Sequence, residues 1–184
     1  MLATALLALC LAGADDRNPA EGVKKVELVV EPAEAKPGQT VTLKLTVTLV
    51  AGCHTYPFAQ ADKAASNFVS KAKFPAAAVD GLIYVGEITA TTDPESKPEP
   101  ALGVKELQFF TTTVTFEKKA VVSPNAKPGE LAAKIASLKL NVCDERDCFK
   151  PTELKPEAKL KVAGEPVAIE KQFADDVKKA LETK

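Results

Sequence analysis

The chain has 184 residues, which fits one domain with a short appendage. Its 24 Lys and Arg residues nearly balance its 25 Asp and Glu residues, and the net charge of −1 argues against nucleic acid or an anionic membrane as a partner. The chain has no tryptophan and only 5% aromatic residues, so its core must consist mainly of Val, Leu, Ala and Phe.

Residues 1–14 are predicted to be an export signal that is removed. The apolar run from Leu2 to Leu11 is too short to span a bilayer, and Ala12-Gly13-Ala14 forms a small-x-small cleavage pattern. The run has no basic residue before it, which is atypical of a signal. We expect a mature chain with a flexible stretch over 15–22, in the periplasm or otherwise exported to the bacterial cell envelope, and with no membrane insertion after cleavage.

Alternating apolar residues predict several β-strands between residues 23 and 163. The clearest is 39–50, where Val or Leu at every second position from Val41 to Leu49 alternates with Thr or Lys. Further strands are predicted over 23–32, 106–122, 130–142 and 157–164. By propensity 130–142 could be helical, but it leads directly into a cysteine-containing turn, which favours a strand. Short strands separated by Pro and Gly predict an all-β antiparallel β-sandwich over 23–163.

Two segments differ from this pattern. Residues 91–103 carry three prolines and several charges, and are predicted to be a surface loop. The tail, 164–184, is predicted to form a C-terminal amphipathic helix, because Ile169, Phe173, Val177 and Leu181 are four residues apart and Ala180 joins their stripe. We expect this stripe to dock on the domain rather than to bind a partner.

Familiar catalytic sets are missing from the sequence. His54 is its one histidine, so a Ser-His-Asp arrangement would depend entirely on that residue. Neither a P-loop nor a GxGxxG motif occurs, and we expect no cofactor.

The expected chemistry therefore depends on the cysteines. Export allows disulfides to persist, and the mature chain holds Cys53, Cys143 and Cys148. The four residues between Cys143 and Cys148 suit a hairpin loop that a disulfide can close, but so short a loop contributes only about 2 kcal/mol. Small exposed rings also tend to be reducible, which favours a redox role.

Zinc is the rival interpretation. Cys53, His54, Cys143 and Cys148 form a nominal four-ligand set. The adjacent residues Cys53 and His54 would face opposite sides of a strand, and an oxidising compartment disfavours free thiolates, so we expect no metal. Cys53 is expected to be an unpaired core thiol.

The segment CDERDCFKPTE, together with AGCHTYPF upstream, resembles the N-terminal domain of DsbD-type thiol:disulfide interchange proteins. The resemblance covers roughly residues 23–163 and implies an immunoglobulin-like sandwich that passes electrons between thioredoxin-like partners through a reversible disulfide. It implies Cys148 as the cysteine that forms the mixed disulfide and Cys143 as the resolving one. The residues that it implies shape the site are Phe149, Pro151, Tyr56 and His54, with Tyr84 as a covering residue. Such a protein is only loosely an enzyme, because its partners consume and renew its chemistry.

An acidic flank surrounds the cysteine pair. Asp144, Glu145 and Asp147 are opposed only by Arg146, and their negative charge is expected to raise the pKa of nearby thiols. The alternative to an electron carrier is a non-catalytic secreted β-sandwich that binds a partner and uses its hairpin disulfide as a structural staple.

Overall fold

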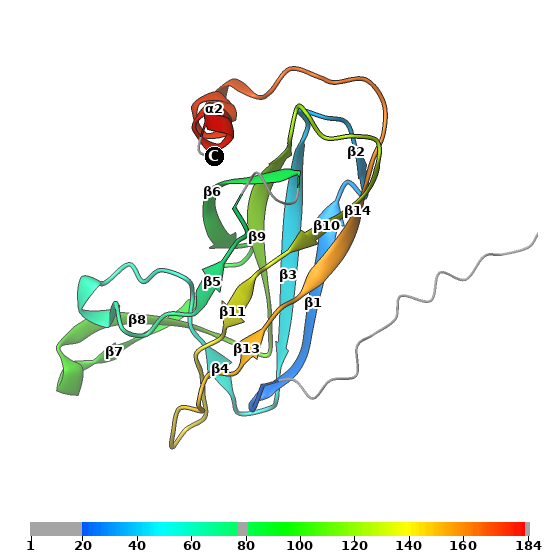
Figure 1. Cartoon of the computed structure of the whole chain (residues 1–184). Helices are drawn as coiled ribbons and strands as arrows, with labels where there is room; N and C mark the ends of the chain where they lie inside the picture. The colour runs from blue at the N-terminus through cyan, green and yellow to red at the C-terminus, as the bar shows by residue number, and fades with distance from the viewer. Residues whose placement is uncertain (1–19, 77–80, 183–184) are drawn as a thin grey trace, which may run out of the picture.

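The computed structural model describes residues 20–76 and 81–182, and it confirms the all-β sandwich with a single short helix at the C-terminal end (Figure 1). The predicted signal at 1–14, including Cys10, lies outside the described residues.

The first layer is an antiparallel sheet in the order β1-β3-β9-β6. Its strands are β1 (Val23–Glu31), β3 (Thr40–Leu49), β9 (Thr113–Val122) and β6 (Leu82–Ala90). The alternation predicted for β3 is confirmed, since its Val and Leu residues from 41 to 49 are at most 5% exposed. Its Thr and Lys residues lie on the opposite face, which is half-buried.

The second layer is built from one long, irregular hairpin. Its outgoing arm contains β10 (Gly129–Lys134), β11 (Ser137–Lys139) and β12 (Val142–Cys143), and its return arm contains β13 (Glu153–Leu154) and β14 (Glu157–Val162). β10 pairs with β14 and β11 with β13, both antiparallel. The short strands β2 (Glu34–Ala35) and β5 (Lys71–Lys73) extend this layer. The prediction of strand over helix for 130–142 is confirmed.

The chain passes between sheets at two neighbouring corners. One connects β3 to β4 (His54–Thr55), and the other connects β8 (Val104–Thr111) to β9 through Thr112. The single strand predicted over 106–122 is therefore wrong. The buried residues Phe110, Val114 and Phe116 keep the same even spacing on both sides of Thr112, so the sequence pattern did not reveal the bend. Thr112 adopts φ 58°, a conformation that β-branched residues seldom take, and its carbonyl accepts the Leu49 N–H at 2.6 Å.

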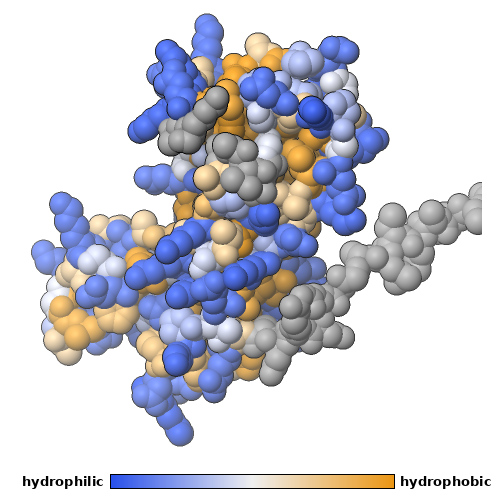
Figure 2. Space-filling model, in the orientation of Figure 1, coloured by the Kyte–Doolittle hydropathy of each residue, from blue (hydrophilic) through white to orange (hydrophobic). Residues whose placement is uncertain are grey.

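A side lobe projects from the sandwich and consists of residues 56–70 and 95–111 (Figure 1). The predicted surface loop over 91–103 is wrong in part, because it contains β7 (Glu95–Glu99), paired with β8, and a 3-10 turn (Pro100–Leu102). β7 is an edge strand that is held by backbone pairing with β8, and the amino-acid composition of a segment does not predict such pairing. Figure 2 shows apolar surface at the outer end of this lobe. Leu102, in the 3-10 turn between β7 and β8, is 56% exposed.

The tail docks on the domain, as predicted. A 3-10 turn (Lys171–Phe173) leads into α2 (Ala174–Glu182), which begins later than the apolar spacing suggested. Val177 is buried, and Ile169, Phe173 and Ala180 pack in the same cluster, whereas Leu181 is 38% exposed. No helix in the described part of the chain is long and apolar enough to cross a membrane.

Candidate functional site at the disulfide hairpin

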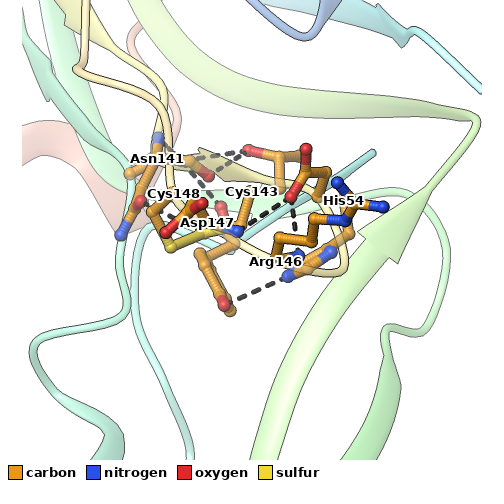
Figure 3. Close-up of a disulfide and its surroundings, with 10 residues drawn as sticks. His54, Asn141, Cys143, Arg146, Asp147 and Cys148 are labelled. Carbon is orange, nitrogen blue, oxygen red and sulfur yellow. Dashed lines mark hydrogen bonds between the residues drawn. A yellow bond between two sulfur atoms is a disulfide. The ribbon is translucent and has the colours of Figure 1, made fainter. Parts of the chain in front are cut away.

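A disulfide joins Cys143 and Cys148 at the closed end of the long hairpin. Their Cα atoms are 3.9 Å apart, and the two residues form an isolated antiparallel β-bridge. Within the ring the Asp144 N–H donates to the Asp147 carbonyl at 2.9 Å, and outside it the Phe149 N–H donates to the Val142 carbonyl at 2.9 Å. Backbone pairing therefore supports the ring on both sides of the disulfide (Figure 3).

The carboxylate of Asp144 caps the hairpin. One of its oxygens accepts the N–H groups of Arg146 and Asp147 at 2.7 and 2.8 Å. These bonds, that from Asp147 first, lower the pKa of Asp144, because they favour its charged form. Asp144 is thus a turn residue whose charge is directed to the loop backbone.

The two cysteines differ sharply in burial. Cys143 is 2% exposed and packs in a cluster with Tyr56, Ala65, Val104 and Leu107, the core of the side lobe. Cys148 is exposed. The disulfide thus ties an exposed loop to a buried cluster.

His54 lies beside the hairpin, in register with Cys143 on the neighbouring strand. Its Nε2 is 3.1 Å from the Tyr56 hydroxyl, and its ring meets those of Tyr56 and Phe109 edge-on. Burial lowers the pKa of His54, Lys97 lowers it further, and Asp144 opposes them. These shifts favour the neutral ring at pH 7.

An open groove of about 660 Å³ runs along this end of the sandwich. Both corners contribute to it, with residues 48–54 on one side and 111–113 on the other, and Lys24, Phe109 and Glu145 complete its lining. Four of the lining residues are threonines. The sequence analysis missed Thr111, Thr112 and Thr113, because they lie inside what looked like one uninterrupted strand.

The other predicted site residues are dispersed. Tyr56 is buried under the hairpin, Phe149 packs against the main core, and Pro151 and Asp147 are exposed. Tyr84 does not have the covering position that the resemblance implied. It lies on β6 in the other sheet, where its hydroxyl bonds both backbone groups of Lys134 and its ring stacks near Phe74.

Cys53 is a free, buried thiol, as expected, and it also lines the groove. Burial raises its pKa, and the charge of Asp144 adds to the effect. Within 20–76 and 81–182 no three or more His, Cys, Asp or Glu side chains are grouped to hold a metal ion. Two of the four nominal zinc ligands are joined to each other in the disulfide.

Comparison with known proteins found no matching family model and no matching curated protein. Solved structures do match. A chain of a type I cohesin–dockerin complex from Clostridium thermocellum has a TM-score of 0.41 and 15% identity over 75% of this chain and 99% of that chain. The seventh ScaB type I cohesin of Pseudobacteroides cellulosolvens has a TM-score of 0.35 and 12% identity over 79% and 96%.

A family 123 glycoside hydrolase from Clostridium perfringens matches with a TM-score of 0.34 and 10% identity, over 73% of this chain and 22% of that one. At these values the matches assign no function. They do correct the expected family, because the matched structures are cohesin modules and other proteins and not DsbD-type domains. The predicted thiol–disulfide exchange, electron transfer and thioredoxin-like partners are wrong together with that family.

Proposed function

We propose that the chain is an exported, non-catalytic β-sandwich module that binds an extended segment of a partner protein. The groove beside the hairpin is the binding surface, and the Cys143–Cys148 disulfide is a structural staple. The observation that carries this proposal is the convergence of both sheet-crossing corners and the stapled hairpin on one groove.

The burial of Cys143 supports a structural role for the disulfide. Its sulfur belongs to the core of the side lobe, while Glu145 of the same ring lines the groove. Closing the ring therefore fixes one wall of the groove relative to the lobe. A fixed wall lowers the entropy that a ligand must overcome on binding.

The surroundings of His54 support binding rather than catalysis. The only histidine of the chain faces a tyrosine hydroxyl and two aromatic rings, and its ring is held neutral. A general base is usually oriented by a carboxylate or a similar acceptor, and no such hydrogen bond to His54 occurs among the described contacts. His54 instead offers a flat, polar-edged surface in the groove.

The lining fits a polypeptide in an extended conformation. Threonine hydroxyls provide donors and acceptors, Phe109 provides an apolar surface, and Lys24 and Glu145 provide charges of both signs. Val50, 46% exposed at the rim, adds apolar contact. Binding sites commonly combine apolar surface with a few placed polar groups. The unusual backbone of Thr112 lies at the same place, and such outliers cluster at functional sites.

Peptide display tests the binding surface. Random peptides are selected on the full chain, and the affinity of an enriched peptide is measured for wild type, for Thr113→Arg and for the control Thr152→Arg. Thr113 lines the groove, whereas Thr152 is an exposed residue outside its lining. We expect at least about a tenfold loss for Thr113→Arg, since 1.4 kcal/mol of lost contact suffices, and little change for Thr152→Arg. Enriched peptides that bind Thr113→Arg and Thr152→Arg with equal affinity would refute the assignment of the groove as the binding surface.

Redox titration tests the staple separately. The chain is equilibrated in thiol buffers of graded potential, alkylated, and analysed by peptide mass spectrometry. A structural disulfide should stay oxidised down to about −300 mV. A pair that is reduced at clearly higher potentials while the fold stays intact would contradict the staple.

A further inference from the structure

The groove beside the hairpin has two distinct ends, and each end is fixed by paired strands. At one end Thr48 of β3 is opposite Thr113 of β9, and at the other end His54 of β4 is opposite Thr111 of β8. All four residues line the groove. The chain changes sheets at both corners between these pairs, so the two ends belong to different sheets.

Lys24 lies at the Thr48 end of the groove. The register of β1 against β3 shifts between Val23 and Lys25, so Lys24 is the extra residue of a β-bulge. Lys25, its neighbour, is opposite Thr48. Bulges redirect side chains and are frequent beside functional sites. The exposed Lys24 therefore brings a positive charge to the end where the hydroxyls of Thr48 and Thr113 are 3.4 Å apart.

Glu145 lies at the His54 end of the groove. His54 is opposite Cys143 in the pairing of β4 with β12, so the disulfide ring begins beside this end. Glu145 of the ring is exposed and lines the groove. Figure 1 shows the start of β1 and the disulfide hairpin on either side of the connection from β3 to β4. The charges of Lys24 and Glu145 therefore lie at opposite ends of the groove.

Both charges are available to a ligand. Among the described residues, neither Lys24 nor Glu145 forms an ion pair. Arg146 and Asp147, which follow Glu145 in the ring, carry opposite charges, and neither of them lines the groove. A ligand can therefore pair with Lys24 and Glu145 without breaking a described ion pair of the protein.

Three further charges near the groove are already engaged. Asp144 accepts two backbone N–H groups of its own loop. Glu95 accepts the Thr111 hydroxyl at 2.5 Å, and the Lys97 ammonium lies over the Phe109 ring, 5.6 Å from its centre. The two unpaired charges therefore distinguish the ends of the groove.

We propose that the groove binds an extended segment that carries one acidic and one basic side chain, with the acidic one at Lys24 and the basic one at Glu145. This inference rests on the proposed function, because it requires that the groove is the binding surface. An ammonium beside threonine hydroxyls suits a carboxylate, and the Glu145 carboxylate suits an ammonium or a guanidinium. A segment with two like charges would meet repulsion at one end, and such repulsion suppresses wrong partners.

Peptides that differ only in charge test this pairing. Three mixtures have blocked ends and two charged residues separated by random uncharged spacers of varied length: one acidic and one basic, two acidic, or two basic. Wild type should bind the mixed-charge peptides at least about threefold more tightly than either like-charge mixture, since exposed ion pairs contribute modestly. Lys24→Glu should instead prefer two basic residues, and Glu145→Lys should prefer two acidic ones. The double variant should prefer mixed charges again, because its groove has one charge of each sign.

Neighbouring charges provide matched controls. Lys25→Glu and Glu27→Lys change the net charge of the chain by the same amounts, but Lys25 and Glu27 lie outside the groove lining. All four substituted positions are exposed, so the fold should be kept. Neither control should alter the preference of wild type. The preference should also vanish at about 1 M salt, where the Debye length falls to about 3 Å.

Thr113→Arg separates this inference from the assignment of the groove. If Thr113→Arg weakens binding while Lys24→Glu and Lys25→Glu act alike, the charge pairing is wrong and the groove remains the binding surface. A wild type that binds the three mixtures equally also overturns the charge pairing. If Thr113→Arg has no effect on binding, the groove is not the binding surface, and the proposed function fails together with this inference.

Discussion

Cys148→Ser should lower the free energy of unfolding by about 2 kcal/mol. The disulfide joins residues five positions apart, and the chain-entropy relation gives about 2 kcal/mol for a loop of this size. Cys148 is exposed, so replacing its sulfur by a hydroxyl adds little. For a chain of this length, that loss corresponds to a fall in Tm of about 4–8 °C.

Cys143→Ser should cost more, although it breaks the same bond. Cys143 is 2% exposed among Tyr56, Ala65, Val104 and Leu107, which offer a new hydroxyl few partners. Burying a polar group without a hydrogen bond adds about 1–3 kcal/mol. The expected total is therefore about 3–5 kcal/mol, and the difference between the two variants measures how firmly the disulfide is anchored in the side lobe.

Urea unfolding of both variants measures these values, in a Cys53→Ala background that prevents thiol exchange. The chain with its disulfide chemically reduced should have the same free energy of unfolding as Cys148→Ser within about 0.5 kcal/mol, because both lose only the cross-link. Equal losses for the two variants would show that the burial of Cys143 contributes nothing. A loss below about 0.5 kcal/mol for both would refute the staple itself.

Three further predictions follow from other parts of the fold. The pKa of His54 is below its ordinary value, so on acidification the unfolded chain takes up this proton before the folded chain does. Stability should therefore begin to fall as the pH drops below about 7 and should keep falling below about 6.5, until the folded chain also binds the proton. His54→Gln should remove this part of the pH dependence of the urea midpoint. Thr112→Gly should raise stability by up to about 1 kcal/mol, because glycine relieves the positive φ at this corner, and a lowered Tm would contradict this. Phe116→Ala should cost about 3–5 kcal/mol, because Phe116 is 1% exposed and meets two other rings edge-on, whereas Val29→Ala, at a 48% exposed site, should change calorimetric stability by under about 0.5 kcal/mol.

Local pattern was enough to predict the regular parts of this fold. The strict alternation in β3 and the four-residue spacing in the tail each reflect a single buried face, which fixes the element type without knowledge of its neighbours. The disulfide hairpin was also predictable, because four polar residues between two cysteines suit a tight loop and Asp144 can cap it.

The corners and edges were not predictable in the same way. Phe110, Val114 and Phe116 are all buried and evenly spaced, so the pattern resumes in phase after the exposed Thr112 although the chain changes sheets there. β7 is held by backbone pairing at an exposed sheet edge. Edge strands often carry prolines and charged residues, which prevent aggregation, and the same residues are typical of surface loops. The groove is lined by the residues of both corners, and the sequence therefore did not predict it.

The same corners explain why a binding surface forms at this end of the molecule. β3 pairs with β9 in one sheet, and their continuations β4 and β8 pair in the other. Two paired strands that bend together leave the faces of both sheets meeting at an angle. Leu49 and Cys53 at the bend are buried in the core, whereas Thr111, Thr112 and Thr113 stay exposed. Threonines and His54 fill that angle, and the hairpin closes its side through Glu145. Relieving the bend with Thr112→Gly should therefore stabilise the chain while weakening peptide binding in the groove, a trade-off that a purely structural corner would not show.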